Sequence, residues 1–272
     1  MTLESADGPG FAALTAKISG ERGFGCGSYK EKCLRRRIAV RMRARGVHAF
    51  GDYASLLDRD PAEYEKLLDA LTINVTKLFR NAEAYDAITR EVLPELWNAQ
   101  APELKVWSAG CSSGEETYSL AILFHRHATQ HGNRRVRIVG TDIDRASLAS
   151  AEKGEYAEAA FAETTPEVRH RYFEGDPPRR VKAEPRALVR FEKRDLLREG
   201  PPAYDNHLVV CRNVLIYFDR DSQERLFKGF HDALVPGGFL VLGKVETLLG
   251  PTRALFKTVN ARERIFRKLG PA

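Results

Sequence analysis

The chain has 272 residues and a formal net charge of +6, and 43% of its residues are hydrophobic. This length allows one large domain or two of ordinary size, with enough apolar residues to form a core. No apolar run is long enough to span a membrane and the first residues lack the core of a secretion signal, so we expect a cytoplasmic protein. The four cysteines show neither a CxxC pair nor a metal-ligand spacing, and we expect no metal site.

The first eighty residues are expected to form a helical domain. Residues 1–20 carry small side chains without a clear period, so we expect them to be loosely held. From Ser28 to Ala44 the apolar residues Leu34, Ile38 and Met42 recur at the spacing of one helix face. Two more amphipathic helices are expected, at residues 50–57 and 61–72.

The helix expected at residues 28–44 is strongly basic. Lys32, Arg36 and Arg43 fall roughly opposite its apolar stripe, and we take them as candidate docking residues. A second cationic row is formed by Lys30, Arg37 and Arg41. A solvated helix face would explain both rows equally well. A docking surface would suit an acidic partner, either a nucleic acid or an acidic protein helix.

A β-branched segment, residues 71–80, follows the helical region and carries the polar residues Asn74, Thr76 and Arg80. Residues 82–97 return to a helical pattern, and a short linker leads to the strand at residues 105–107. From there strands and helices alternate, which predicts a mostly parallel sheet. Further strands are expected at residues 136–140, 188–191, 207–211 and 239–242, with a closing hairpin at 256–259 and 263–266.

Residues 156–187 interrupt this alternation. The segment is longer than a strand-to-helix connection needs, and it contains four prolines and a basic cluster. Long insertions in compact domains are usually functional or disordered. We interpret this one as a small subdomain.

The turn after the strand at residues 105–107 is the first candidate site. Gly110, Ser112 and Gly114 leave the backbone accessible before a helix begins, as at the nucleotide side of a doubly wound α/β fold. Glu115 and Glu116 stand where a phosphate would bind. Two carboxylates repel a pyrophosphate and suit a ligand with a positive charge and hydroxyls, such as S-adenosylmethionine. A plain tight turn is the alternative.

Polar residues also follow the later strands. Asp142 is placed to bind ribose hydroxyls or to cap the next helix, for which Asp144 is the better candidate. Asp195 could accept the adenine amino group while Leu196 flanks the ring. Beyond the strand at 207–211, Arg212, Asn213 and Tyr217 are expected at the crevice where open α/β sheets bind ligands. Tyr217 could equally be a half-buried packing residue.

With these segments in order, the chain resembles the CheR-type chemotaxis protein-glutamate O-methyltransferases. The matching segments are residues 72–76 with Phe79-Arg80, 107–116, 140–144 and 211–218. The resemblance runs from about Tyr29 to about Phe266. It implies an α/β fold, a class I S-adenosylmethionine-dependent methyltransferase with a Rossmann-like mixed sheet. It also implies an N-terminal all-helical domain and a small inserted antiparallel β-subdomain.

The corresponding domain boundaries are a helical receptor-docking domain at 1–80, a helix and linker at 81–104 and a methyltransferase domain at 105–272. The inserted β-subdomain takes about residues 156–187. The resemblance assigns cofactor contacts to Asn74, Thr76, Arg80, Glu116, Asp142, Asp195, Leu196 and Arg212. Gly110, Glu115 and Asn213 are added from the residue pattern. Arg80 and Tyr217 are the candidate catalytic residues, Arg80 positioning a carboxylate and Tyr217 orienting the attacking oxygen.

The implied reaction transfers the methyl group to glutamate carboxylates of chemoreceptors and leaves S-adenosylhomocysteine. The implied partners are the cytoplasmic helices of the receptors, bound by a monomer without nucleic acid or membrane insertion. Departures from the family pattern occur at Leu78, Thr117 and Gly243-Lys244-Val245-Glu246, and the insert is short around residues 175–185. The alternatives are a methyltransferase of the same fold for another protein, a nucleic acid or a small molecule, and a non-catalytic cofactor-bound module.

Overall fold

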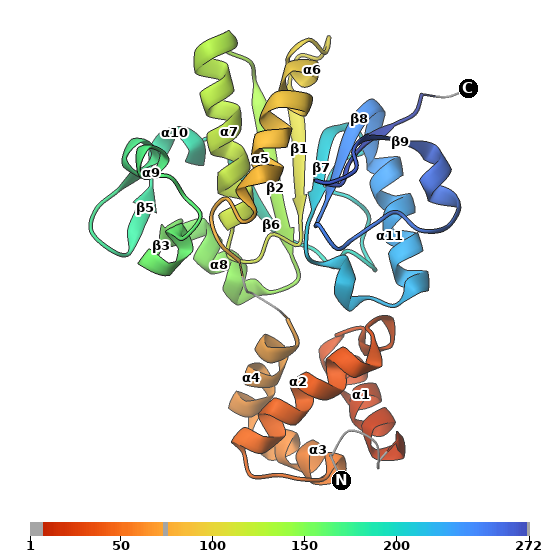
Figure 1. Cartoon of the computed structure of the whole chain (residues 1–272). Coiled ribbons are helices and arrows are strands. Elements are labelled where there is room, and N and C mark those ends of the chain that lie inside the picture. Colours follow the sequence, from red (N-terminus) through yellow and green to blue (C-terminus); the bar gives the residue numbers. More distant parts are fainter. Residues whose placement is uncertain (1–7, 73–75, 271–272) are drawn as a thin grey trace. The chain divides into compact units, whose positions relative to one another are not determined.

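The computed structural model describes residues 8–72 and 76–270. The chain divides into two compact units. Met1–Ile73 with Tyr217–Ser222 form the first, here called the helical unit, and Asn74–Ile216 with Gln223–Ala272 form the second, the sheet unit. Figure 1 shows the helices of the first and the sheet of the second. The predicted Asn74 lies outside the described residues.

The helical unit contains the helices α1 (Gly8–Arg22), α2 (Glu31–Ala44), α3 (Phe50–Arg59) and α4 (Pro61–Leu71). The expectation that residues up to 20 are loosely held is wrong from Gly8 onward. Phe11, Leu14 and Ile18 are buried at helical spacing, a stripe that the surrounding small residues obscure in the sequence. The predicted stripe of α2, formed by Leu34, Ile38 and Met42, is confirmed as buried.

A short segment from far along the chain completes the helical unit. Tyr29 pairs with Phe218 in an isolated antiparallel bridge, and their rings are 4.8 Å apart. The backbone N–H of Lys30 donates to the Tyr217 carbonyl at 2.9 Å, and that of Asp219 donates to the Ser28 carbonyl at 3.0 Å. Tyr217 therefore belongs to this unit.

The sheet unit is built on seven strands in the order β6-β2-β1-β7-β8-β10-β9. The first five are parallel, and β10 pairs antiparallel with both β8 and β9, which confirms the mixed sheet and its closing hairpin. The strands are β1 (Leu104–Ala109), β2 (Val136–Asp142), β6 (Val189–Lys193), β7 (Asn206–Cys211), β8 (Leu234–Leu242), β9 (Phe256–Asn260) and β10 (Ile265–Lys268).

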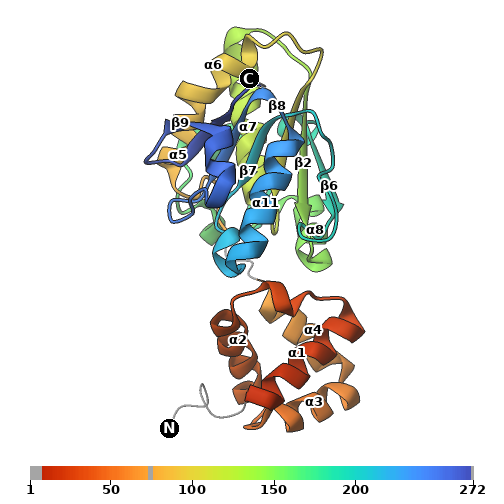
Figure 2. The ribbon, with the colours of Figure 1, turned by 90° about the vertical axis from the view of Figure 1, so that its right-hand side faces the viewer.

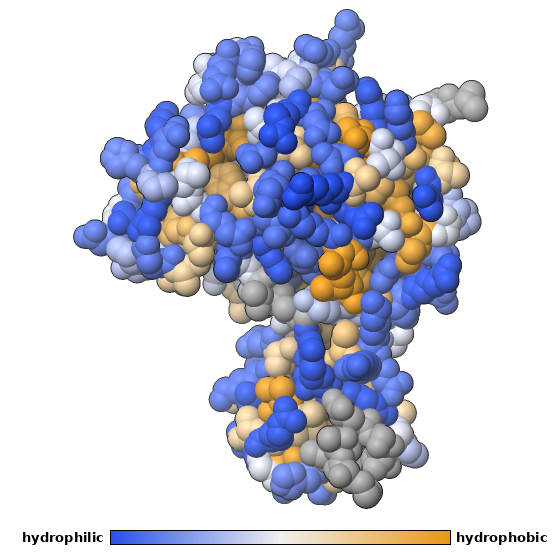
Figure 3. All heavy atoms as spheres, in the orientation of Figure 1, coloured by the Kyte–Doolittle hydropathy of each residue, from blue (hydrophilic) through white to orange (hydrophobic). Residues whose placement is uncertain are grey.

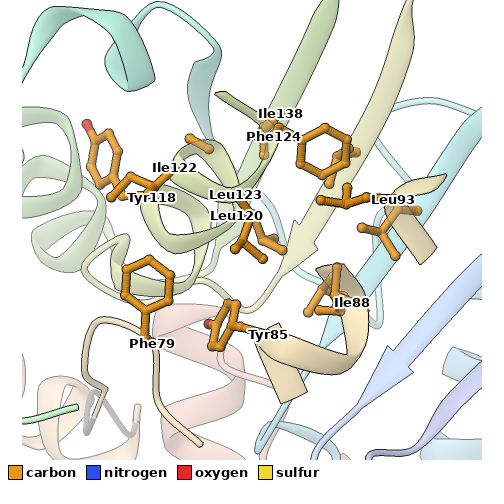
Figure 4. Close-up of a cluster of buried hydrophobic side chains, with 14 of the residues drawn as sticks. Phe79, Tyr85, Ile88, Leu93, Tyr118, Leu120, Ile122, Leu123, Phe124 and Ile138 are labelled. Carbon is orange, nitrogen blue, oxygen red and sulfur yellow. The ribbon is translucent and has the colours of Figure 1, made fainter. Parts of the chain in front are cut away.

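Helices cover both faces of this sheet (Figures 1 and 2). Val106 joins the buried cluster of α7 (Glu115–His131), whereas the next residue, Trp107, packs its ring 5.5 Å from Phe230 of α11 (Arg220–Ala233). Successive side chains of a strand point to opposite faces, so α7 and α11 lie on opposite sides. Figure 4 shows the cluster on the α7 side.

The helical pattern at residues 82–97 is confirmed as a continuous run. It consists of α5 (Ala82–Ala87), a π-helical turn (Ile88–Val92) and α6 (Leu93–Trp97). Pro94 has no N–H to donate to the preceding turn, which accounts for the irregular hydrogen bonding just before it. The remaining helix of the sheet unit's core is α8 (Arg145–Lys153).

The segment at 156–187 forms a small subdomain. A three-stranded antiparallel sheet pairs β5 (Arg179–Val181) with β3 (Glu155–Tyr156) and β4 (Phe173–Glu174). The short helices α9 (Pro166–Tyr172) and α10 (Ala183–Arg186) accompany it. Together with the mixed sheet and the helical unit, this subdomain confirms the predicted fold class.

Hydrophilic side chains cover most of the face of the sheet unit drawn in Figure 3. Among the described residues, the exposed large hydrophobic side chains are Val40, Tyr204, Val245 and Leu269. No helix in the described part of the chain is long and apolar enough to cross a membrane.

Candidate functional site

The turn between β1 and α7 has a fixed backbone conformation. Gly110, Ser112 and Gly114 all have positive φ, at 76°, 50° and 91°. The N–H groups of Gly110 and Cys111 both donate to the Thr141 carbonyl, at 2.8 and 2.9 Å. A Cβ on Gly110 would lie 2.6 Å from a methyl carbon of Val214, so this position requires glycine.

Asp142, at the end of β2, stabilises that turn through hydrogen bonds to backbone N–H groups. Its Oδ2 accepts from the Ser112 N–H at 2.8 Å, and its Oδ1 accepts from the Asp144 N–H at 3.0 Å. Burial raises the pKa of this carboxyl. Asp144 caps α8 by accepting from the Ala146 N–H at 2.9 Å. Each oxygen of Asp142 has a second lone pair, so ribose binding stays a prediction for it.

The two glutamates at the start of α7 have different surroundings. Glu115 accepts a hydrogen bond from the Ser113 hydroxyl at 2.7 Å, within the turn. Glu116 accepts from the Ser108 hydroxyl at 2.9 Å, and its other oxygen is 3.8 Å from the Arg212 guanidinium. Burial raises the pKa of both carboxyls, that of Glu116 to about 7. Glu116 thus lies toward the strand ends, while Glu115 stays with the turn.

Arg212 follows β7 and has a side chain only 3% exposed. Its NH2 donates to the Arg80 carbonyl at 2.8 Å and to the Asn81 side-chain oxygen at 3.2 Å. Its Nε is buried and finds no hydrogen-bond partner among the described residues. The structure therefore brings together three predicted site residues, Glu116, Arg212 and the backbone of Arg80.

Arg80 lies in a strained segment. Its neighbours Phe79 and Asn81 have φ of 56° and 58°, a region that is unfavourable for phenylalanine and more readily adopted by asparagine. The Phe79 N–H donates to the Ser119 hydroxyl at 2.8 Å, and the Asn81 N–H donates to Glu163 at 2.6 Å. These bonds to α7 and to the insert hold the segment in place. Thr76 is half-buried before it.

Glu246 is not among the residues that the sequence predicts for the site, yet it holds together two loops at the strand ends. Its carboxylate accepts from three backbone N–H groups, those of Gly243 at 2.7 Å, Leu215 at 2.8 Å and Asn213 at 3.0 Å. It thereby ties the loop after β8 to the loop after β7, where Asn213 has a φ of 61°. The only sequence signal for it is the final glutamate of the segment Gly243–Glu246.

The predicted adenine residues lie in the loop after β6. The Asp195 carboxylate accepts from the Leu197 N–H at 2.9 Å, so part of its hydrogen-bonding capacity is used within the loop. Leu196 lines a cavity of about 260 Å³ together with Trp107 and Phe230. The adenine contact remains a prediction.

The predicted docking residues Lys32, Arg36 and Arg43 are exposed on α2. Two members of the second cationic row, Arg41 and Arg37, are engaged within the helical unit. Arg41 forms a two-pronged ion pair with the fully buried Glu63, at 3.0 and 2.6 Å. The Arg37 guanidinium donates to the Leu71 carbonyl and lies 4.9 Å from the ring centroid of Tyr217.

The residues around Glu116 and Arg212 suit S-adenosylmethionine. A buried carboxylate can hold the ammonium or sulfonium charge. The Arg212 Nε–H, which has no acceptor among the described residues, can hold the methionine carboxylate. The described residues include no group of three or more His, Cys, Asp or Glu that could hold a metal ion.

Comparison with known proteins covers both units. Residues 9–72 match the family described as "CheR methyltransferase, all-alpha domain", and residues 74–265 match "CheR methyltransferase, SAM binding domain". A chemotaxis protein methyltransferase of Listeria monocytogenes is 34% identical over 91% of this chain and 93% of its own length. Chemotaxis protein methyltransferase 1 of Pseudomonas aeruginosa is also 34% identical, over 91% of this chain and 92% of its own.

Proposed function

Because the chain belongs to the CheR methyltransferase family, we propose that it methylates glutamate side chains of chemoreceptors. The methyl donor is S-adenosylmethionine, and the products are glutamate methyl esters and S-adenosylhomocysteine. The observation that carries the proposal is the buried Glu116–Arg212 pair beside the backbone of Arg80.

When bound, S-adenosylmethionine supplies a methyl group activated by a positively charged sulfur. The acceptor is a glutamate carboxylate, which is ionised at neutral pH because its pKa is about 4.3. The chain therefore has no need of a general base. Its residues must orient the carboxylate and keep water away from it.

Arg80 and Tyr217 are the proposed catalytic residues. We assign to Arg80 the positioning of a carboxylate, because a guanidinium held against the attacking oxygen would stabilise the ground state and slow transfer. We assign to Tyr217 the orientation of the attacking oxygen. Unchanged single-turnover methyl transfer in Tyr217→Phe would contradict that role.

Receptor docking is assigned to the exposed row Lys32, Arg36 and Arg43. Support comes from the division of charge on α2, where Arg37 and Arg41 are engaged inside the unit and the exposed row faces solvent. The expected partner is an acidic surface of receptor helices, bound by a monomer. The reaction would then take place where those helices lie, in the cytoplasm.

Radiolabelled S-adenosylmethionine tests the acceptor class directly. The protein is incubated with receptor-containing membranes, with nucleic acid, or with neither. We expect label on the receptor only, released as volatile product by mild base, as carboxyl methyl esters are. Label on nucleic acid, or base-stable label on the receptor, would contradict the proposal.

A further inference from the structure

Tyr85 of α5 has a buried hydroxyl that the proposed function leaves unexplained. The residue is 3% exposed, and its hydroxyl has no hydrogen-bond partner among the described residues. Figure 4 shows its ring beside Phe79 at the edge of the apolar cluster, with the two ring centroids 5.3 Å apart. Phenylalanine would fill the same space without the cost of burying an unpaired hydroxyl.

The ring of Tyr85 supports Arg212. The guanidinium carbon lies 5.2 Å from the ring centroid, which is within the range of a cation–π contact. The other sides of the guanidinium are occupied by the Arg80 carbonyl, the Asn81 side chain and Glu116. Nε is also buried, and none of the described residues offers it an acceptor.

Two buried hydrogen-bond donors, the Tyr85 hydroxyl and Arg212 Nε, therefore have no acceptor within the described parts of the chain. Burial raises the pKa of Tyr85, while the Arg212 guanidinium and the Ser119 hydroxyl act on it in the opposite direction. The hydroxyl stays protonated at neutral pH and lies close enough to Arg212 to interact with it. A guanidinium N–H can only donate, and a protonated phenol can donate as well, so the pair matches an acceptor group such as a carboxylate.

We propose that the Tyr85 hydroxyl and Arg212 Nε together bind the carboxylate of the methionine portion of S-adenosylmethionine. This inference rests on the proposed cofactor and is independent of the proposed acceptor. The ring of Tyr85 keeps Arg212 in position, and its hydroxyl supplies the second donor.

Titration calorimetry with two ligands tests the proposal on the full chain. S-adenosylhomocysteine carries the carboxylate, and decarboxylated S-adenosylmethionine lacks it. We expect Tyr85→Phe to weaken binding of the first about tenfold, as for loss of one hydrogen bond to a charged group, and of the second less than about twofold. Equal weakening for both ligands, or none for either, would overturn the proposal.

Two controls separate binding from folding. The unliganded Tyr85→Phe protein should melt at the wild-type temperature or above it, because the described residues give the lost hydroxyl no hydrogen-bond partner. A clear drop in that temperature would show a structural bond and overturn the proposal. Tyr172, in the insert, has a hydroxyl that contacts His125 of α7, and Tyr172→Phe should leave affinity for both ligands unchanged.

The acceptor assay keeps the two proposals apart. If wild-type protein binds S-adenosylhomocysteine in a Tyr85-dependent way but does not methylate receptors, only the proposed acceptor fails. If wild-type protein does not bind S-adenosylhomocysteine, both proposals fail.

Discussion

Two opposing effects, burial and the charge of Arg212, act on the pKa of Glu116. Burial raises its pKa to about 7, and the guanidinium of Arg212 at 3.8 Å limits the rise. A glutamate in the unfolded chain has a pKa of about 4.3. The folded protein therefore holds the Glu116 proton more tightly than the unfolded chain does. The resulting contribution to the free energy of unfolding is complete below about pH 4.3 and is lost as the pH rises to about 7.

Glu116→Gln should remove this pH dependence, because glutamine stays neutral. Relative to the variant, wild-type protein should lose on the order of 2 kcal/mol of unfolding free energy between about pH 5 and about pH 8. Urea unfolding of the unliganded proteins at several pH values measures the difference, in which all other titrations cancel. A difference that does not change with pH would contradict the shifted pKa.

A second prediction at the scale of one residue concerns the contribution of Glu246 to stability. Glu246→Ala leaves three buried backbone N–H groups without an acceptor, which should lower the free energy of unfolding by about 3 kcal/mol or more. Glu246→Gln keeps one acceptor oxygen and should lower the free energy of unfolding by less than Glu246→Ala does. Denaturant unfolding of both variants tests this, and a loss below about 1 kcal/mol in Glu246→Ala would show that these bonds are easily replaced.

Sequence patterns can identify some of the residues around Glu116 and Arg212 but not others. Glu116 and Arg212 could be predicted because they follow a strand or begin a helix at the edge where α/β sheets bind ligands. The bonds of Glu246 could not, because its partners are backbone groups of two separate loops and carry no residue-type signal. Tyr85 has the spacing of an ordinary core aromatic, and what distinguishes it is a buried hydroxyl to which no described residue is hydrogen-bonded.

At the scale of elements, α2 illustrates how two similar rows of charge differ in use. Each row contains one lysine and two arginines at helical spacing. The buried Glu63, 22 residues beyond Arg41, pairs with that arginine, and the Leu71 carbonyl accepts from Arg37. Periodicity within one helix cannot reveal a partner on another helix, so the sequence alone could not separate the rows.

Charge reversal in the exposed row should slow receptor methylation without changing stability or cofactor binding. Arg36→Glu with Arg43→Glu should lower the rate of receptor methylation on the order of tenfold, because charge complementarity governs encounter. The free energy of unfolding should change by less than about 0.5 kcal/mol, and affinity for S-adenosylhomocysteine should not change. Methylation rates, denaturant unfolding and calorimetry on the same preparation measure these quantities.

A matched control reverses two exposed charges elsewhere. Arg190→Glu with Lys257→Glu changes the net charge equally, on β6 and β9 at the two edges of the sheet. This protein should methylate receptors at close to the wild-type rate. An equal loss in both double variants would mean that net charge, rather than the α2 surface, governs docking.

At the scale of the whole molecule, the chain passes between its two units more than once. It leaves the helical unit near residue 73 and returns to it for Tyr217–Ser222. The alternation of strands and helices predicts the sheet unit well, because each strand and helix there is signalled by its own local period. The return at Tyr217–Ser222 depends on tertiary pairing with Tyr29 and Lys30, which no local period encodes.

Peptide mapping by mass spectrometry of a receptor incubated with S-adenosylmethionine tests the central claim most directly. We predict a mass gain of one methylene group on receptor glutamates, sensitive to mild base. With Arg212→Lys, which keeps the charge but loses the fork of N–H donors, this gain should be strongly reduced. A gain on any other residue type, or an undiminished gain with Arg212→Lys, would contradict the account.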